Sequence, residues 1–164
     1  MPRSRRPVDA AEPLVGVAPL VSRWVERVLA THDPKLTLGQ FLALRAIAAG
    51  RLNAAELARR TGVSGAAVSQ LVAALDQAGW LERSQAPDDR RRQALALTDA
   101  GGRVYRSAAR LVHARVGELL GAFPAPEIDR LGRLLERLEQ TLGGAPPPRP
   151  PPPPPKPRRG PRRP

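Results

Sequence analysis

The chain has 164 residues, a length that suits one compact domain with short appendages. Its 27 lysines and arginines against 15 acidic residues give a formal charge of +12, so a polyanion is the first partner to consider. The chain contains no cysteine, which excludes thiol catalysis, structural disulfides and a cysteine-based redox switch.

The basic N-terminus, residues 1–12, is predicted to be disordered. Asp9 and Glu12 interrupt its apolar character, which argues against a signal peptide. No apolar run approaches the roughly 18 residues that a membrane-spanning helix needs. We therefore expect a soluble, cytoplasmic protein with no membrane partner.

Apolar spacing and capping signals predict four helices in the first half of the chain. Thr37 and Gln40 have the spacing of a capping box, and Asn53 and Ser64 suit the N-cap positions of two later helices. The predicted helices cover residues 13–32, 36–50, 53–62 and 64–80.

The second half predicts two short strands followed by two longer helices. The strands cover residues 80–85 and 92–98 and are joined by a charged tip. Thr98 is the predicted N-cap of a helix over 99–121, and an amphipathic helix follows at 126–142. The predicted fold class is therefore mostly α (α+β), with one small hairpin.

The stretch 53–80 has the pattern of a helix-turn-helix. Gly62 suits a left-handed position in the turn, and Ala58 is small where the two helices cross. The N-terminal end of a recognition helix reaches base edges and phosphates. We therefore predict that DNA contacts the outward residues there, namely Ser64, Gly65, Ala66, Ser69 and Gln70. A helical corner without a DNA function, in which Ser64 only caps the helix, is the alternative.

The segment SQAPDDRRRQALALTDAG, residues 84–101, places a dense charge cluster just after this predicted recognition helix. A hairpin in that position is typical of a wing, whose arginines contact the DNA backbone or a narrow minor groove. We predict that Asp89, Arg90, Arg91 and Arg92 make this contact, with the aspartate orienting a guanidinium. A solvated charged loop is the alternative.

The run from LTLGQFLAL at residue 36 to the end of this segment resembles the MarR family of bacterial winged helix-turn-helix regulators. Its most specific motif is the wing, which reads Asp89-Arg90-Arg91 and then, after alternating residues, Leu97-Thr98 and Gly101. The resemblance implies that Arg91 reaches the minor groove of double-stranded DNA and that Asp89 orients it. It also implies a homodimer, most often a repressor, on a pseudo-palindromic operator.

This resemblance suggests a division of the chain. Residues 13–35 and 99–144 are expected to form dimerisation helices, and residues 36–98 the winged helix-turn-helix region. Residues 145–164 hold 12 of the 20 prolines and six positive charges without an acid, so we expect a disordered Pro/Arg-rich tail. This tail also permits two other functions: an architectural nucleoid protein that binds DNA without sequence preference, or a polyproline ligand for a protein partner.

Members of the family often bind small phenolic or anionic effectors between the reader domain and the dimer bundle. The residues predicted to line such a site are Trp24, His32, Phe41, Arg45 and His113. The alternative is that the aromatic residues belong to the core and the histidines to the surface. Catalysis, a metal ion and any other cofactor are not expected, because the two histidines lie far apart and no Gly-rich phosphate loop is present.

Overall fold

The computed structural model describes residues 6–50, 52–86 and 89–144, apart from the side chains of Pro7 and of residues 84–93. Residues 1–5 of the predicted basic N-terminus and the whole predicted tail, 145–164, lie outside the described residues. Over the described part of the chain the elements follow the order α-α-α-α-β-β-α-α, with one two-stranded sheet. The predicted fold class is therefore confirmed.

The first helix, α1 (Pro7–Leu29), begins earlier than predicted. The backbone N–H of Arg6 donates a hydrogen bond to the Asp9 carboxylate at 3.0 Å, and Pro7 stands in the first turn, where proline is tolerated. Residues 7–12 are thus helical, and the prediction that they are disordered is wrong. Arg6 is not a residue type that signals an N-cap, so the sequence pattern missed this start.

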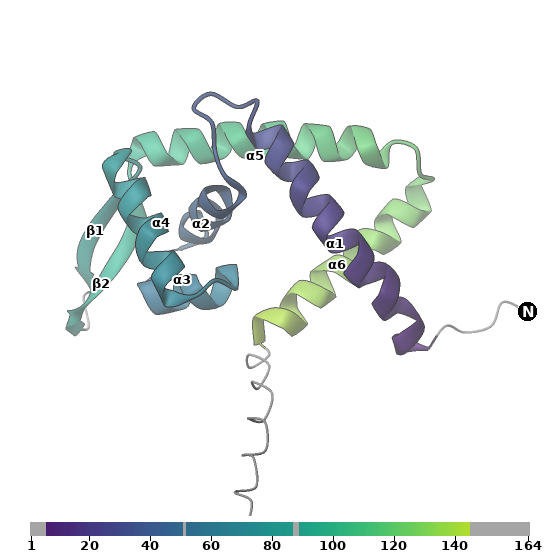
Figure 1. Ribbon diagram of the computed structural model, residues 1–164, viewed down its shortest axis with the longest axis horizontal. Helices are drawn as coiled ribbons and strands as arrows, with labels where there is room; N and C mark the ends of the chain where they lie inside the picture. Colours follow the sequence, from purple (N-terminus) through teal and green to yellow (C-terminus); the bar gives the residue numbers. More distant parts are fainter. Residues whose placement is uncertain (1–5, 51, 87–88, 145–164) are drawn as a thin grey trace, which may run out of the picture.

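Three helices and the hairpin form one packed unit: α2 (Leu38–Ala48), α3 (Ala54–Thr61), α4 (Gly65–Gln77), β1 (Leu81–Ala86) and β2 (Asp89–Leu97). Figure 1 shows the hairpin beside α4, with α3 and α2 next to them. The predicted capping box of α2 is confirmed, since the Gln40 N–H donates to the Thr37 hydroxyl at 3.1 Å and the Thr37 N–H to the Gln40 amide oxygen at 3.0 Å.

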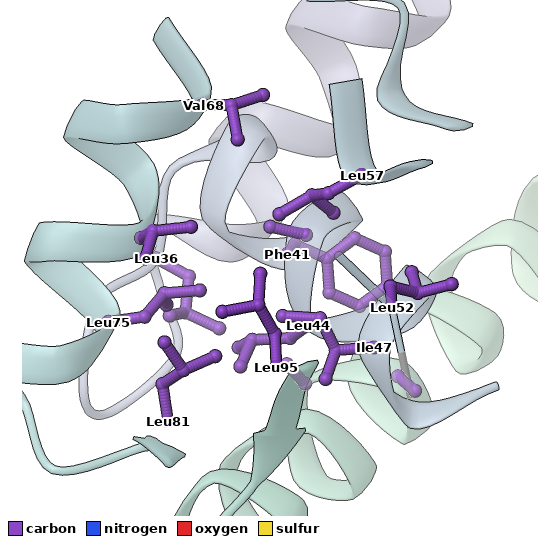
Figure 2. Close-up of a cluster of buried hydrophobic side chains, with 14 of the residues drawn as sticks. Leu36, Phe41, Leu44, Ile47, Leu52, Leu57, Val68, Leu75, Leu81 and Leu95 are labelled. Carbon is purple, nitrogen blue, oxygen red and sulfur yellow. The ribbon is translucent and has the colours of Figure 1, made fainter. Parts of the chain in front are cut away.

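Every element of this unit contributes at least one leucine to the core, which also holds Phe41, Ile47 and Val68 (Figure 2). Leu44 on α2, Leu57 on α3 and Leu75 on α4 are fully buried. Leu52, just before α3, joins the hairpin, because the Leu95 N–H donates to the Leu52 carbonyl at 2.7 Å. Each buried leucine contributes about 1.5–3 kcal/mol of hydrophobic free energy. The three helices and the hairpin are therefore expected to move as one body.

The long helix α5 (Asp99–Leu120) connects this unit to the C-terminal helix α6 (Ala125–Gly144). In Figure 1, α5 runs from the hairpin past the end of α1, and α6 then turns back toward α3. Gly101 lets α5 begin close to the sheet, since a Cβ at this position would clash with the carbonyl oxygen of Trp80.

Two helices carry apolar side chains that the chain itself leaves uncovered. On α1 these side chains recur at helical spacing, and on α6 they form a leucine stripe. Between 39% and 66% of the surface of each remains exposed in Leu14, Val17, Leu20, Val21, Leu131, Leu134, Leu135 and Leu142. Exposed apolar surface of this extent is typical of a surface that another chain covers.

Candidate nucleic-acid interface

The α3–turn–α4 corner is fixed by two local features that the sequence predicts, the Asn53 N-cap and the left-handed Gly62, and by a return hydrogen bond to Glu56 that was not predicted. The Asn53 side chain accepts a hydrogen bond from the Glu56 N–H at 2.9 Å, and the Glu56 carboxylate accepts one from the Asn53 N–H at 2.9 Å. Gly62 adopts a left-handed conformation with φ 69° and donates its N–H to the Ala58 carbonyl at 2.9 Å. An L-residue with a Cβ is strained in that conformation, so glycine sets the angle between the helices.

One face of α4 is buried and the opposite face is open. Val68, Val72 and Leu75 are buried, and Leu71 packs against the start of α2 next to Gly39. The residues predicted to face outward from this end of α4 are all exposed, which confirms their predicted orientation. They are Ser64, Gly65, Ala66, Ser69 and Gln70. Apart from Gln70 these residues are small, so a DNA duplex could approach the N-terminal half of α4 closely.

The two serines at this end of α4 make hydrogen bonds within the helix. The Ser64 hydroxyl accepts from the Ala67 N–H at 3.3 Å, which confirms its N-cap role. The Ser69 hydroxyl donates to the Gly65 carbonyl at 3.1 Å. The hydroxyl proton of Ser64 and the lone pairs of Ser69 are not used in these two bonds. Ser64 could thus donate to a phosphate oxygen while it caps the helix.

The base of the hairpin is tied to the end of α4. The Thr98 hydroxyl donates to the Gly79 carbonyl at 2.7 Å, and the Thr98 N–H donates to the Trp80 carbonyl at 3.1 Å. An ion pair between Arg83 on β1 and Asp76 on α4, 3.1 Å long, crosses the same junction. The direction of the hairpin relative to α4 therefore depends on several independent contacts.

The strand register shows where the charged cluster lies. β1 and β2 pair regularly from Leu81↔Leu97 to Gln85↔Gln93, and the next pair is Ala86↔Asp89. Among the described residues, this shift, a bulge or a similar irregularity, leaves residues 90–92 of β2 without partners in the register. The prediction that the tip of the hairpin extends through Arg91 is therefore wrong, because β2 begins at Asp89 and not, as predicted, at Arg92. A bulge bends the backbone of a strand and increases its local twist.

The residues predicted to line an effector site do not gather in one place. Phe41 is buried in the core and its ring centroid lies 6.1 Å from that of Tyr105. His32 is only 7% exposed; its Nδ1 lies 2.7 Å from the Pro34 carbonyl oxygen, and its buried Nε2 has no partner among the described residues. Trp24 is half-buried at the surface of α1, whereas His113 is exposed on α5.

Arg45 alone of these five residues lines a groove of about 880 Å³ between α2, α3 and α6. Its guanidinium pairs with the Glu139 carboxylate of α6 at 2.7 Å. The groove has an apolar wall that includes Leu42, Leu135 and Leu138. A small molecule with an apolar body and a negative charge fits this combination of surfaces.

Two further arginines, Arg59 and Arg60, were not predicted as site residues. Both are exposed in the last turn of α3 and line the same groove. In the sequence they look like ordinary basic residues at a helix C-terminus, where they complement the helix dipole. Only the return of α6 to this point reveals them as part of a groove.

Within the described ranges, no three histidine or acidic side chains converge in a way that could hold a metal ion. Nor is any described helix both long enough and apolar enough to cross a membrane.

A helix-turn-helix followed by a hairpin that packs against its second helix defines a winged helix-turn-helix protein. Comparisons with known proteins agree. The family whose model matches residues 35–92 is the MarR family. The HTH-type transcriptional repressor Rv2887 of Mycobacterium tuberculosis is 31% identical over 104 residues, which cover 63% of this chain and 75% of that protein.

Solved structures show the same fold. The MarR family protein Rv2887 of Mycobacterium tuberculosis in complex with p-aminosalicylic acid has a TM-score of 0.66 at 27% identity, covering 78% of this chain and 96% of that one. The MarR family regulator Sco3205 of Streptomyces coelicolor in complex with DNA has a TM-score of 0.67 at 24% identity, covering 85% and 91%. The chain belongs to the MarR family, and is a DNA-binding transcriptional regulator.

Proposed function

We propose that this regulator is a cytoplasmic homodimer that represses transcription from a pseudo-palindromic operator and is released by a small anionic effector. The observation that carries the proposal is the pairing of an open recognition-helix end with a hairpin whose three consecutive arginines fall at a shift in the strand register. The relative Rv2887 is named a transcriptional repressor, which supports the sign of regulation.

In this proposal α4 enters the major groove and the hairpin lies against the neighbouring backbone. Ser64, Gly65 and Ala66 are placed to approach phosphates, whereas Ser69 and Gln70 face base edges, where a glutamine can pair with adenine. The minor groove or its phosphates are contacted by the guanidinium groups of Arg90, Arg91 and Arg92. An ion pair with the Asp89 carboxylate orients one of these groups.

The uncovered apolar faces of α1 and α6 support a homodimer. Figure 1 shows both helices on the side of the molecule away from the hairpin, so a second copy could cover them without obstructing α4. Closed two-fold symmetry is the commonest arrangement of homo-oligomers, and it duplicates the reading helix. Because each protomer carries the same recognition helix, the operator must contain two related half-sites.

The effector is proposed to bind the groove between α2, α3 and α6. A carboxylate there would compete with Glu139 for the guanidinium of Arg45, while an aromatic ring would rest on the leucine wall. The complex of Rv2887 with p-aminosalicylic acid supports this chemical class. The groove lies between the helix-turn-helix and α6. A ligand bound there could therefore change the distance between the two recognition helices of the dimer.

The experiment that tests DNA reading is a titration of the DNA upstream of the protein's own gene with wild type and Arg91→Ala. Removing a guanidinium from the minor groove should weaken binding by about 1–3 kcal/mol, or roughly 5- to 150-fold. Arg106→Ala on α5 removes the same charge from an exposed residue outside the proposed interface and should leave the affinity nearly unchanged. Equal affinities for wild type and Arg91→Ala would contradict the wing assignment.

The same titration separates the proposal from an architectural role. A specific repressor should prefer its operator over shuffled DNA by on the order of 10³-fold or more at physiological salt. An architectural protein would show little preference at any salt concentration, and that result would overturn the proposed function.

A further inference from the structure

The groove between α2, α3 and α6 carries more positive charge than a single carboxylate would balance. Of the described residues that line it, three are arginines and one is an acid, which gives a net charge of +2. The acid, Glu139, is paired with Arg45 at 2.7 Å. Arg59 and Arg60 are exposed, and neither forms an ion pair with a side chain that the structure describes. Two guanidinium groups of the groove therefore have no role in the proposed contact with Arg45.

The groove also extends beyond the Arg45–Glu139 pair. Leu142 and Gly143, in the last turn of α6, line it together with Thr61 and Gly62, which form the turn before the recognition helix. Figure 1 shows α6 running back from α5 and ending near α3. Its volume of about 880 Å³ lies toward the upper end of the roughly 300–1,000 Å³ typical of sites for drug-sized ligands. The groove thus has room for a ligand larger than one ring with one carboxylate.

The three arginines of the groove belong to one packed unit. Arg45 lies in the last turn of α2, and Arg59 and Arg60 lie in the last turn of α3. These two helices share the leucine core, in which Leu44 and Leu57 are fully buried. The backbone positions of the guanidinium groups are therefore fixed relative to one another before a ligand binds. A site that is arranged in advance loses less entropy on binding, so it favours a rigid ligand whose charges match its spacing.

We propose that the groove binds an aromatic dicarboxylate, with one carboxylate on Arg45 in place of Glu139 and the second on Arg59 and Arg60. The inference deepens the proposed function and rests on it, because it takes this groove as the effector site. Guanidinium groups favour carboxylates, with which they form two parallel hydrogen bonds. The ring would lie against the apolar wall of leucines, and a ligand charge of −2 balances the net charge of the groove.

The experiment compares benzoate with phthalate, isophthalate and terephthalate, which add a second carboxylate at three different separations on the same ring. Binding to the full-length protein is measured by calorimetry at neutral pH and one fixed ionic strength, because salt screens exposed charges. At least one dicarboxylate should bind about 10-fold more tightly than benzoate, since it adds a charge-assisted contact to guanidinium groups that remain partly in solvent.

A double variant tests which residues recognise the second carboxylate. Arg59→Gln with Arg60→Gln should reduce the affinity for the preferred dicarboxylate to that for benzoate, while the affinity for benzoate stays nearly unchanged. The matched control, Arg103→Gln with Arg106→Gln, removes two exposed charges from α5, outside the residues that line the groove. This control should keep the preference for the dicarboxylate, because only the net charge of the protein has changed.

Two results would overturn the second carboxylate site. One is that none of the three dicarboxylates binds more tightly than benzoate. The other is that the α3 double variant and the α5 control reduce the preference equally, because the arginines of α3 would then act only through net charge.

A third variant, Arg45→Gln, separates this inference from the proposed function. If it weakens benzoate binding while the dicarboxylates gain nothing over benzoate, the effector groove stands and only the second carboxylate site fails. If wild type binds none of the four ligands, or if Arg45→Gln changes none of the affinities, the proposed effector groove fails and the inference fails with it.

Discussion

Thr98 connects three elements, and removing its hydroxyl should lower the free energy of unfolding in a predictable way. The hydroxyl accepts a hydrogen bond from the Gly101 N–H at 3.1 Å and donates one to the Gly79 carbonyl at 2.7 Å. Loss of an N-cap costs about 1 kcal/mol, and loss of the second hydrogen bond costs about another 1 kcal/mol. Thr98→Val keeps the size of the side chain, so the expected destabilisation is about 2 kcal/mol.

The assay is urea unfolding followed by circular dichroism at one fixed protomer concentration, because a dimer unfolds in a concentration-dependent manner. The midpoint should fall with an unchanged m value, and the melting temperature should drop by about 4–8 °C. Thr98→Ser is the matched control, since it retains both hydroxyl bonds and should lose less than half as much. If Thr98→Val stays within about 0.5 kcal/mol of wild type, the reasoning about this junction is refuted.

Two further predictions concern the effector and the dimer. Arg45→Ala should weaken salicylate binding by roughly 10- to 100-fold in calorimetry, because a charge-assisted bond is lost, whereas Arg106→Ala should not; equal affinities would exclude Arg45 from the site. Leu134→Glu should raise the dimer dissociation constant at least about 100-fold in sedimentation velocity, because it introduces a charge into the apolar stripe of α6. Gln140→Glu on the opposite side of the same helix should leave the dimer intact, and dissociation of both variants alike would contradict the assigned interface.

The sequence predicts correctly those features that depend on residues close together in the chain. Asn53 and Ser64 cap their helices because the N–H groups they satisfy lie three residues away. Gly62 adopts a left-handed conformation because the turn requires it. The outward face of α4 follows from apolar residues at helical spacing, which must turn toward the core.

Where the sequence prediction differs from the structure, the deciding contact is unusual or distant. The early start of α1 depends on a hydrogen bond from Arg6 to Asp9, and arginine carries no capping signal. The position of the three consecutive arginines depends on strand register. Alternation predicts register only where apolar and polar residues take turns, and a run of like charges supplies no such pattern.

The sequence by itself therefore determined the order of the elements, the caps of α2, α3, α4 and α5, the turn before the recognition helix and the resemblance to the MarR family. Only the tertiary structure decided that Arg45, Arg59 and Arg60 border one groove with α6, that His32 is buried, and that α6 ends beside Gly62. The physical reason is how far apart along the chain the residues of each feature lie. A cap or a helical face is an arrangement of neighbouring residues, whereas the groove exists because the chain reverses after α5 and brings α6 to the same groove as α2 and α3.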